Sequence, residues 1–260
     1  MSTKTLIAWT DHTANFWIGC MKVSPGCANC YAETLAKNRM GLHVWGPPST
    51  TGRKPVSSVY SNLRKWNKAS DPANPSKVFV GSMMDWAEDH ADAEKLRPAM
   101  WESMLKNDRL IFQLLTKRPE RIRGLLPWFW KGIKSRVWMG VSIESVNYTH
   151  RADFVRDLDC AVRFVSYEPA LGPIARALNL TGLDWVIVGG ESGPGFRSMD
   201  LQWARDMKAA CEAKGVAFFF KQSAAPRTEQ GIELDGEIVR NYPARVALPM
   251  ASLFPSQSKP

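Results

Sequence analysis

Long apolar runs are missing from this sequence of 260 residues. No run approaches the roughly 18–20 apolar residues that a helix needs to cross a bilayer. Residues 1–7 also contain neither the apolar core nor the small-residue cleavage site of a signal peptide. We therefore expect neither a membrane protein nor a secreted one. Hydrophobic residues make up 45% and charged residues 23% of the chain, which are the proportions of a folded globular protein.

Cysteine is also scarce, and its number, five, is odd. A secreted domain held together by disulfides would be shorter and would carry its cysteines in pairs. Here Cys20, Cys27 and Cys30 lie within eleven residues, whereas Cys160 and Cys211 are isolated. In a reducing cytoplasm, where we expect this protein to be, three clustered thiols indicate metal ligands.

Acidic residues are rare in the first 70 positions, which hold nine basic and two acidic residues of a chain whose net charge is +9. Residues 53–70 contain five basic residues and no acidic one, with Tyr60 and Trp66 between them. Such a stretch can follow a phosphate backbone while its rings stack on bases, or it can be a solvated surface loop. The charge favours a nucleic acid or nucleotide as partner. The candidate contacts are Arg53, Lys54, Arg64, Lys65 and Lys68.

Short apolar runs alternate with amphipathic segments along most of the chain. The pattern predicts strands at 6–9, 77–82, 110–115, 137–142, 161–166, 185–188 and 216–220. It predicts helices at 31–40, 91–106, 120–130, 148–158, 174–178 and 201–214. Near-continuous apolar strands that alternate with helices indicate a parallel sheet covered on both faces. About seven such units predict an α/β fold, a complete or partial TIM-type (β/α) barrel.

Polar residues follow nearly every predicted strand. In a (β/α) barrel these residues converge at the carboxyl ends of the strands, where the active site lies, whereas a doubly wound open sheet draws on fewer strands. We therefore favour the barrel, formed by residues 1–222 with a cysteine-bearing loop after its first strand and a basic insertion at about 41–76. Residues 223–260 are predicted to be a peripheral tail with a hairpin around Asp235-Gly236.

The three-cysteine loop contains a Ser24-Pro25-Gly26 turn that folds Cys20 back toward Cys27 and Cys30. Three thiolates can hold a [4Fe–4S] cluster by three irons and leave the fourth iron open for a ligand. A zinc site would need a fourth ligand, for which the sequence offers His12, His43 or Cys160. Three buried, unligated thiols are the remaining interpretation.

These cysteines belong to a longer set of motifs: residues 16–20 (FWIGC), 24–33 (SPGCANCYAE), 115–119 (LTKRP), 140–144 (GVSIE), 167–173 (YEPALGP), 188–193 (VGGESG) and 219–222 (FFKQ). On these motifs the sequence resembles the radical S-adenosylmethionine superfamily, and more specifically a phage- and prophage-associated three-cysteine family assigned to it. The cysteine spacing here is C-x6-C-x2-C, whereas the superfamily usually has C-x3-C-x2-C. Gly189-Gly190-Glu191 follows a late strand, whereas the superfamily's glycine-rich element follows the second.

The resemblance implies a [4Fe–4S] cluster on Cys20, Cys27 and Cys30 that binds S-adenosylmethionine. It also implies an electron donor, either a reductase or a flavodoxin or ferredoxin, and reductive cleavage that gives a 5′-deoxyadenosyl radical for hydrogen abstraction. The cofactor contacts that we expect are Ser82, Asp85, Lys117, Ser142, Glu144, Gly189, Gly190 and Glu191. Glu168 and Lys221 are expected to face the substrate as catalytic residues.

The basic stretch and the phage association together favour a nucleobase in phage DNA as substrate, isomerised or functionalised at a C–H bond after flipping out of the duplex. Three alternatives stay open. One is a non-catalytic nucleic-acid-binding protein with zinc, and another is a photoproduct-lyase-like repair enzyme. The third is a hydrolase that uses Glu144 or Glu168 as general base.

Overall fold

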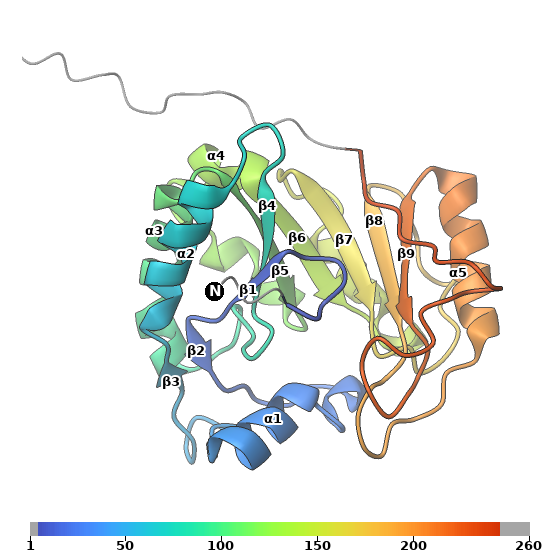
Figure 1. Cartoon of the computed structure of the whole chain (residues 1–260), viewed down its shortest axis with the longest axis horizontal. Coiled ribbons are helices and arrows are strands. Elements are labelled where there is room, and N and C mark those ends of the chain that lie inside the picture. The colour runs from blue at the N-terminus through green and yellow to red at the C-terminus, as the bar shows by residue number, and fades with distance from the viewer. Residues whose placement is uncertain (1–4, 245–260) are drawn as a thin grey trace, which may run out of the picture.

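The computed structural model describes residues 5–244, and its centre is one parallel sheet of seven strands. In spatial order the strands are β1 (His12–Ala14), β4 (Ser76–Val80), β5 (Leu110–Thr116), β6 (Val137–Ser142), β7 (Val162–Tyr167), β8 (Trp185–Gly189) and β9 (Ala217–Gln222). Spatial order follows chain order, and the sheet curls into a half-barrel (Figure 1). The prediction of a partial (β/α) barrel is confirmed.

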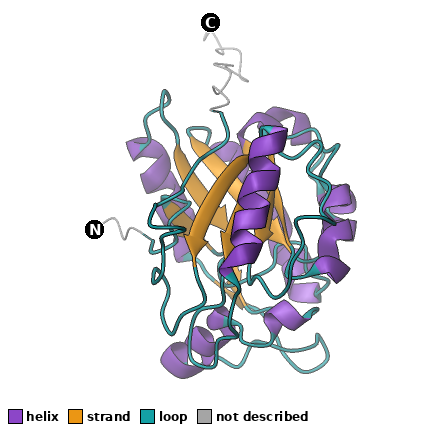
Figure 2. Ribbon diagram, turned by 90° about the vertical axis from the view of Figure 1, so that its right-hand side faces the viewer, coloured by secondary structure: helices purple, strands orange, loops and turns teal. Residues whose placement is uncertain are grey.

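Helices cover the outside of the curve (Figures 1 and 2). They are α2 (Ser58–Ala69), α3 (Ala91–Lys106), α4 (Trp130–Ile133) and α5 (Leu201–Lys214). Helix α1 (Tyr31–Met40) lies apart from them, across one end of the half-barrel (Figure 1). The predicted bounds of α1, α3 and α5 agree with the structure. Helix α5 begins where the Asp200 carboxylate caps the amide of Gln202, and it ends at Gly215 in the left-handed conformation.

Both faces of the sheet are buried, and an apolar layer packs against each face. In β5, Phe112 and Leu114 face the helices, whereas Ile111 belongs to a second cluster inside the curve. That inner cluster is strongly aromatic and includes Trp9 and Trp185, whose rings meet edge to face with centroids 6.2 Å apart. It fills the amino-terminal end of the half-barrel and leaves the carboxyl end open.

Several predicted elements are wrong. The first strand of the sheet is β1, not residues 6–9, because Trp9 packs into the inner cluster instead of pairing with β4. The predicted helix at 120–130 is a pair of 3₁₀ turns, Pro119–Arg121 and Arg123–Leu125, followed by α4. Residues 148–158 are mostly one 3₁₀ helix, Val146–Phe154, and residues 174–178 form turns.

A second, two-stranded antiparallel sheet pairs β2 (Trp17–Ile18) with β3 (Lys54–Pro55). The segment predicted as a basic insertion therefore contains β3 and helix α2. No described helix is long and apolar enough to cross a membrane.

The chain after β9 packs along the edge of the main sheet. Asp235 and Gly236 form a tight turn with positive φ angles of 56° and 80°, between the bridged residues Leu234 and Glu237. Further on, the amide of Phe220 donates to the Val239 carbonyl at 2.8 Å, and the amide of Asn241 donates to the Phe218 carbonyl at 3.0 Å. Of the predicted tail, residues 223–244 are described and residues 245–260 lie outside the described part.

Candidate functional site: a three-cysteine pocket

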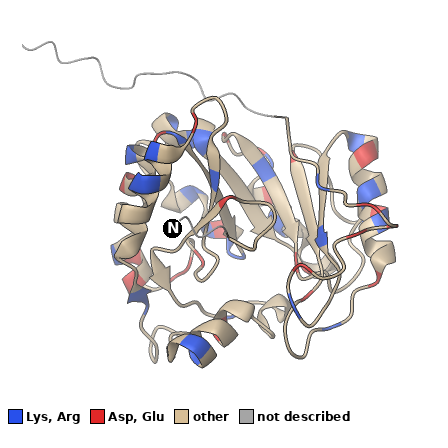
Figure 3. Cartoon of the chain, viewed as in Figure 1, with Lys and Arg blue, Asp and Glu red and all other residues tan. Residues whose placement is uncertain are grey.

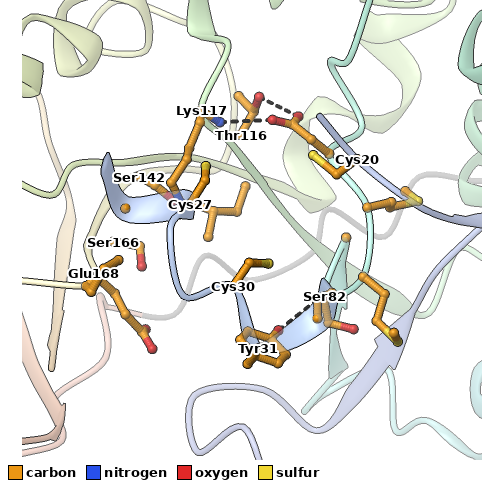
Figure 4. Close-up of a pocket in the computed structure, with 18 of the residues that line it drawn as sticks. Cys20, Cys27, Cys30, Tyr31, Ser82, Thr116, Lys117, Ser142, Ser166 and Glu168 are labelled. Atoms are coloured by element: carbon orange, nitrogen blue, oxygen red, sulfur yellow. Dashed lines mark hydrogen bonds between the residues drawn. The ribbon is translucent and has the colours of Figure 1, made fainter. Parts of the chain in front are cut away.

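One pocket of about 210 Å³ opens at the carboxyl ends of the strands (Figure 4). Residues in the last positions of β4 to β9 or just after these strands converge on it, namely Gly190 and the polar residues Ser82, Asp85, Thr116, Lys117, Ser142, Ser166, Glu168, Glu191 and Lys221. Trp9, Phe79 and Leu115 supply an apolar floor. This convergence is the geometry that a (β/α) barrel imposes on strand-end residues.

All three clustered cysteines line this same pocket (Figure 4). Cys27 ends a 3₁₀ turn, Pro25–Cys27, whose first backbone bond runs from the Cys27 amide to the Ser24 carbonyl at 2.9 Å. Cys30 is the residue at the N-cap position of α1, where its side chain makes no capping hydrogen bond. No disulfide joins any of the five cysteines, all of which lie in the described residues. The turn thus presents three free thiols to one cavity.

Arg118 is a pocket residue to which the sequence assigned no role in the site. Its guanidinium is nearly buried and donates to the Cys20 sulfur at 3.8 Å, to the Met21 carbonyl at 2.7 Å and to Asp85 at 2.7 Å. Burial and the Asp85 carboxylate raise the pKa of the Cys20 thiol above its usual range, and Arg118 opposes that rise. The only sequence signal was its place in the polar run after β5.

Asp85 has a different role from the predicted one. Its Oδ1 accepts bonds from the Thr116 hydroxyl at 2.6 Å and the Ala87 amide at 3.0 Å. Its Oδ2 accepts from Arg118 at 2.7 Å and from the Lys117 amide at 3.2 Å. The carboxylate is used within the protein to hold Arg118 and the end of β5.

Glu144 is also misplaced in the sequence prediction. Its side chain is fully buried, pairs with Arg151 at 2.9 Å and does not line the pocket. Gly26 packs directly over it, so that a Cβ at that glycine would lie 3.2 Å from the Glu144 Cδ. Glu144 therefore supports the cysteine turn from behind. Its second carboxylate oxygen, Oε1, is buried and has no hydrogen-bond partner within residues 5–244.

Glu168 and Lys221 lie together at the pocket, where the Lys221 amino group donates to the Glu168 carboxylate. Gly189 leaves room for Glu168, since a Cβ there would lie 3.2 Å from its Cδ. At Gly190 a Cβ would lie 2.2 Å from the Ala224 amide nitrogen. Both glycines therefore make room for neighbouring protein, and Gly190 also lines the pocket, whereas Gly189 does not.

The remaining predicted cofactor contacts keep positions at the pocket. Lys117 and Ser142 line it, and the hydroxyl of Ser82 accepts a bond from Asn15 at 2.9 Å. The Tyr31 hydroxyl donates to the Ser82 carbonyl at 2.8 Å, which ties the start of α1 to the end of β4 (Figure 4).

Four of the five predicted nucleic-acid contacts are exposed on the outside of the molecule: Lys54, Arg64, Lys65 and Lys68. The last three belong to α2, whose ribbon carries several basic positions (Figure 3). The prediction for Arg53 is wrong, because its side chain is fully buried and pairs with Glu88 at 2.7 Å. Trp66 is also buried and stacks on His12 with centroids 4.4 Å apart. Its ring packs in the core and does not face an incoming base.

The three candidates for a fourth zinc ligand do not lie at the pocket with the cysteines. Cys160 precedes β7, at the end of the sheet opposite the pocket, and His12 stacks on Trp66. His43 is exposed and does not line the pocket. Within residues 5–244, no three His, Cys, Asp or Glu side chains lie close enough together to hold a single metal ion.

A protein-family model described as a protein of unknown function (DUF5131) matches residues 4–243. The chain belongs to the DUF5131 family. The matched region of this DUF5131 protein contains the whole seven-stranded sheet, helices α1 to α5 and every residue of the cysteine pocket. Comparisons of the chain with curated proteins and with solved structures found no match.

Proposed function

We propose that this DUF5131 protein is a cytoplasmic radical S-adenosylmethionine enzyme that modifies a nucleobase in phage DNA, by isomerisation or C–H functionalisation. The observation that supports it most is that Cys20, Cys27 and Cys30 line one pocket at the open end of a half-barrel. Polar side chains from six successive strand ends face the same cavity. The enzyme class rests on this arrangement together with the sequence resemblance.

The donor set fits a [4Fe–4S] cluster. Each thiolate would bind a different iron, so the three sulfurs need not converge on one point as they must around a single zinc ion. The guanidinium of Arg118 beside Cys20 suits a sulfur that carries negative charge. When bound, the cluster and S-adenosylmethionine supply the reductive cleavage that leads to hydrogen abstraction from a substrate.

The remaining pocket residues would bind and orient the cofactor and the substrate. Lys117 offers a cation for a carboxylate, and the hydroxyls of Ser82 and Ser142 offer hydrogen bonds to an amino group or a ribose. The apolar floor of Trp9 and Phe79 keeps water out of the deep end. The pair of Glu168 and Lys221 can hold or move a proton beside the substrate.

A polyanionic substrate is supported by the exposed residues Lys54, Arg64, Lys65 and Lys68, which carry no acidic neighbour in the sequence from 53 to 70. Such residues contact phosphates without reading the bases. The base itself would reach the pocket by flipping out of the duplex. The electron would come from a reductase, a flavodoxin or a ferredoxin.

The test is anaerobic reconstitution with iron and sulfide, followed by incubation with S-adenosylmethionine and a strong reductant. We expect a brown protein with about four irons per chain, in line with a single cube, and release of 5′-deoxyadenosine. Cys20→Ala, Cys27→Ala and Cys30→Ala each abolish both results, whereas Cys160→Ala, a cysteine outside the pocket, leaves them unchanged.

A colourless protein that holds one zinc, or a loaded cluster with no 5′-deoxyadenosine, would overturn the proposal. The substrate is tested separately by salt-dependent binding to duplex DNA and by nucleoside analysis of treated DNA. Turnover on irradiated DNA alone would instead identify a photoproduct lyase.

A further inference from the structure

The cysteine turn is bound by a loop that lies more than 160 residues away in the sequence. The side-chain Nδ2 of Asn29 donates to the Glu191 carboxylate and to the Gly195 carbonyl, each at 2.9 Å. From the same loop, Arg197 donates to the Pro25 carbonyl at 3.1 Å. Arg197 also binds Glu191 through its backbone amide at 2.9 Å and its Nε at 3.0 Å. We call Asn29, Glu191 and Arg197 the bracket.

The bracket joins the Glu191–Arg197 ion pair to the neutral side-chain amide of Asn29 at the pocket. The Glu191 side chain is 5% exposed, so its bonds are shielded from water. Burial opposes its ionisation, but the hydrogen bonds from Arg197 and Asn29 outweigh burial and lower the pKa of Glu191. The same pairing raises the pKa of Arg197. Charge-assisted bonds of this kind are about twice as strong as neutral ones.

The other side of the turn is also in tight contact with the barrel. A Cβ at Gly26 would lie 3.2 Å from Glu144 and 3.3 Å from Pro169, so the turn sits against the ends of β6 and β7. Cys20, by contrast, is held separately by Arg118. The segment with Cys27 and Cys30 therefore lies between two contacts. On one side Gly26 packs against the ends of β6 and β7, and on the other side the bracket binds the turn.

We propose that Glu191 and Arg197 are positioning residues that fix Cys27 and Cys30 at the pocket before any metal binds. This assigns Glu191 to the cysteine turn, in place of the cofactor contact that the sequence predicted for it. The inference rests on the proposed function only in treating these cysteines as ligands. Its geometric part stands without a cluster.

The test measures how fast each cysteine of the metal-free protein reacts with N-ethylmaleimide under anaerobic conditions, by peptide mass spectrometry. In Arg197→Gln we expect Cys27 and Cys30 to react about tenfold faster, because removing charged hydrogen bonds lowers the free energy of local opening. Arg197→Lys should show a smaller acceleration. The rates at Cys20, Cys160 and Cys211 should stay the same, as should the melting temperature to within a few degrees.

The matched control is Arg163→Gln. Arg163 binds Asp184 by the same pattern of backbone amide and guanidinium bonds, at 2.7 and 2.9 Å, but at the opposite end of the sheet. It should leave the rates at Cys27 and Cys30 unchanged, and Cys160 is left out of this comparison because the Arg163 charge acts on its thiol. Equal acceleration at every cysteine in Arg197→Gln, or none at Cys27 and Cys30, would overturn the proposal.

The iron content of the same variants separates this inference from the proposed function. If the wild type loads a cluster, Arg197→Gln should load less iron and give an altered electron paramagnetic resonance signal. If the wild type loads no cluster at all, the proposed function fails, while the alkylation rates still decide whether the bracket positions the turn.

Discussion

The side chain of Arg53 is wholly buried and pairs at 2.7 Å with Glu88, which is equally buried. The guanidinium also donates to the carbonyls of Val44 and Gly46, each at 3.0 Å, so it joins the loop after α1 to the core. Truncating one member of such a pair leaves an uncompensated charge in the interior. The residue is therefore a structural one, although its sequence neighbours are basic surface residues.

We predict that Glu88→Ala lowers the free energy of unfolding by about 3–5 kcal/mol, the usual result of breaking a buried pair. Urea denaturation measures it. Glu102→Ala is the control, since Glu102 forms an exposed i,i+4 pair with Lys106 and should cost less than about 0.5 kcal/mol. Equal costs would contradict the interior role of the Arg53–Glu88 pair.

Glu191 gives a pH prediction. Its pKa is lowered in the folded protein, so the unfolded chain binds the proton more tightly. The stabilisation is complete above the ordinary value of 4.5 and is lost as the pH falls through the lower, folded value. Between about pH 6 and 3, the wild type should therefore lose more unfolding free energy than Glu191→Gln. Parallel pH profiles for the two proteins would count against the bonds described at this carboxylate.

At the scale of elements, most regular pieces were predictable and short irregular ones were not. Helix α2, which lies inside the predicted basic insertion, is an exception. Helices α3 and α5 have clear amphipathic patterns and end signals, and β6 is a continuous buried run, so local sequence determines them. Gly124 and Pro127 interrupt the segment 120–130, which forms 3₁₀ turns instead. Trp9 looked like part of a strand because burial inside a barrel and burial within a sheet select the same apolar residues.

The candidate site divides in the same way. The cysteines and most strand-end residues were predictable, because parallel strands bring their carboxyl ends together. Arg118, Asn29 and Arg197 were not, because their partners lie far away in the chain and a single sequence does not show such pairings. Asp85 and Glu144 had the right residue type for a ligand contact, but protein groups bind both carboxylate oxygens of Asp85 and one of Glu144.

We predict that the basic residues of helix α2 contribute to DNA binding. Three of its basic residues, Arg64, Lys65 and Lys68, are exposed on the outside of the sheet. Changing them to Gln should weaken duplex DNA binding and lower the slope of log K against log salt by about 0.9 for each phosphate that the protein no longer neutralises. The control changes Lys208 and Lys214 of α5 instead. Fluorescence anisotropy at several salt concentrations checks both. An unchanged slope would show that α2 does not face the nucleic acid.

The molecule as a whole is a half-barrel whose sheet does not close on itself. At the β9 edge, residues after β9 pair with the backbone groups of Phe218 and Phe220 that an open edge would leave unpaired. Tyr242 completes this cover, with its ring 5.3 Å from Trp185 and its hydroxyl bound to the Ala8 carbonyl at 3.2 Å. Segments near both ends of the described chain therefore meet below the aromatic interior.

We predict that Tyr242→Ala makes the amides of Phe220 and Asn241 exchange with solvent at least about tenfold faster, while amides in the central strand β6 are unaffected. Tyr242→Phe keeps the ring and should show a smaller effect, since it removes one hydrogen bond. Hydrogen–deuterium exchange followed by mass spectrometry measures both. Faster exchange throughout β6 would mean that the segment supports the whole sheet, not its edge alone.

Trp9 belongs both to the floor of the pocket and to the aromatic cluster beneath it, with its ring 4.6 Å from that of Phe79. Its indole nitrogen is buried and has no hydrogen-bond partner within residues 5–244. We expect an indole in that position to change its emission when a ligand enters the cavity. The protein therefore carries a built-in optical probe of occupancy, and comparison with Trp9→Phe separates its signal from that of the other tryptophans.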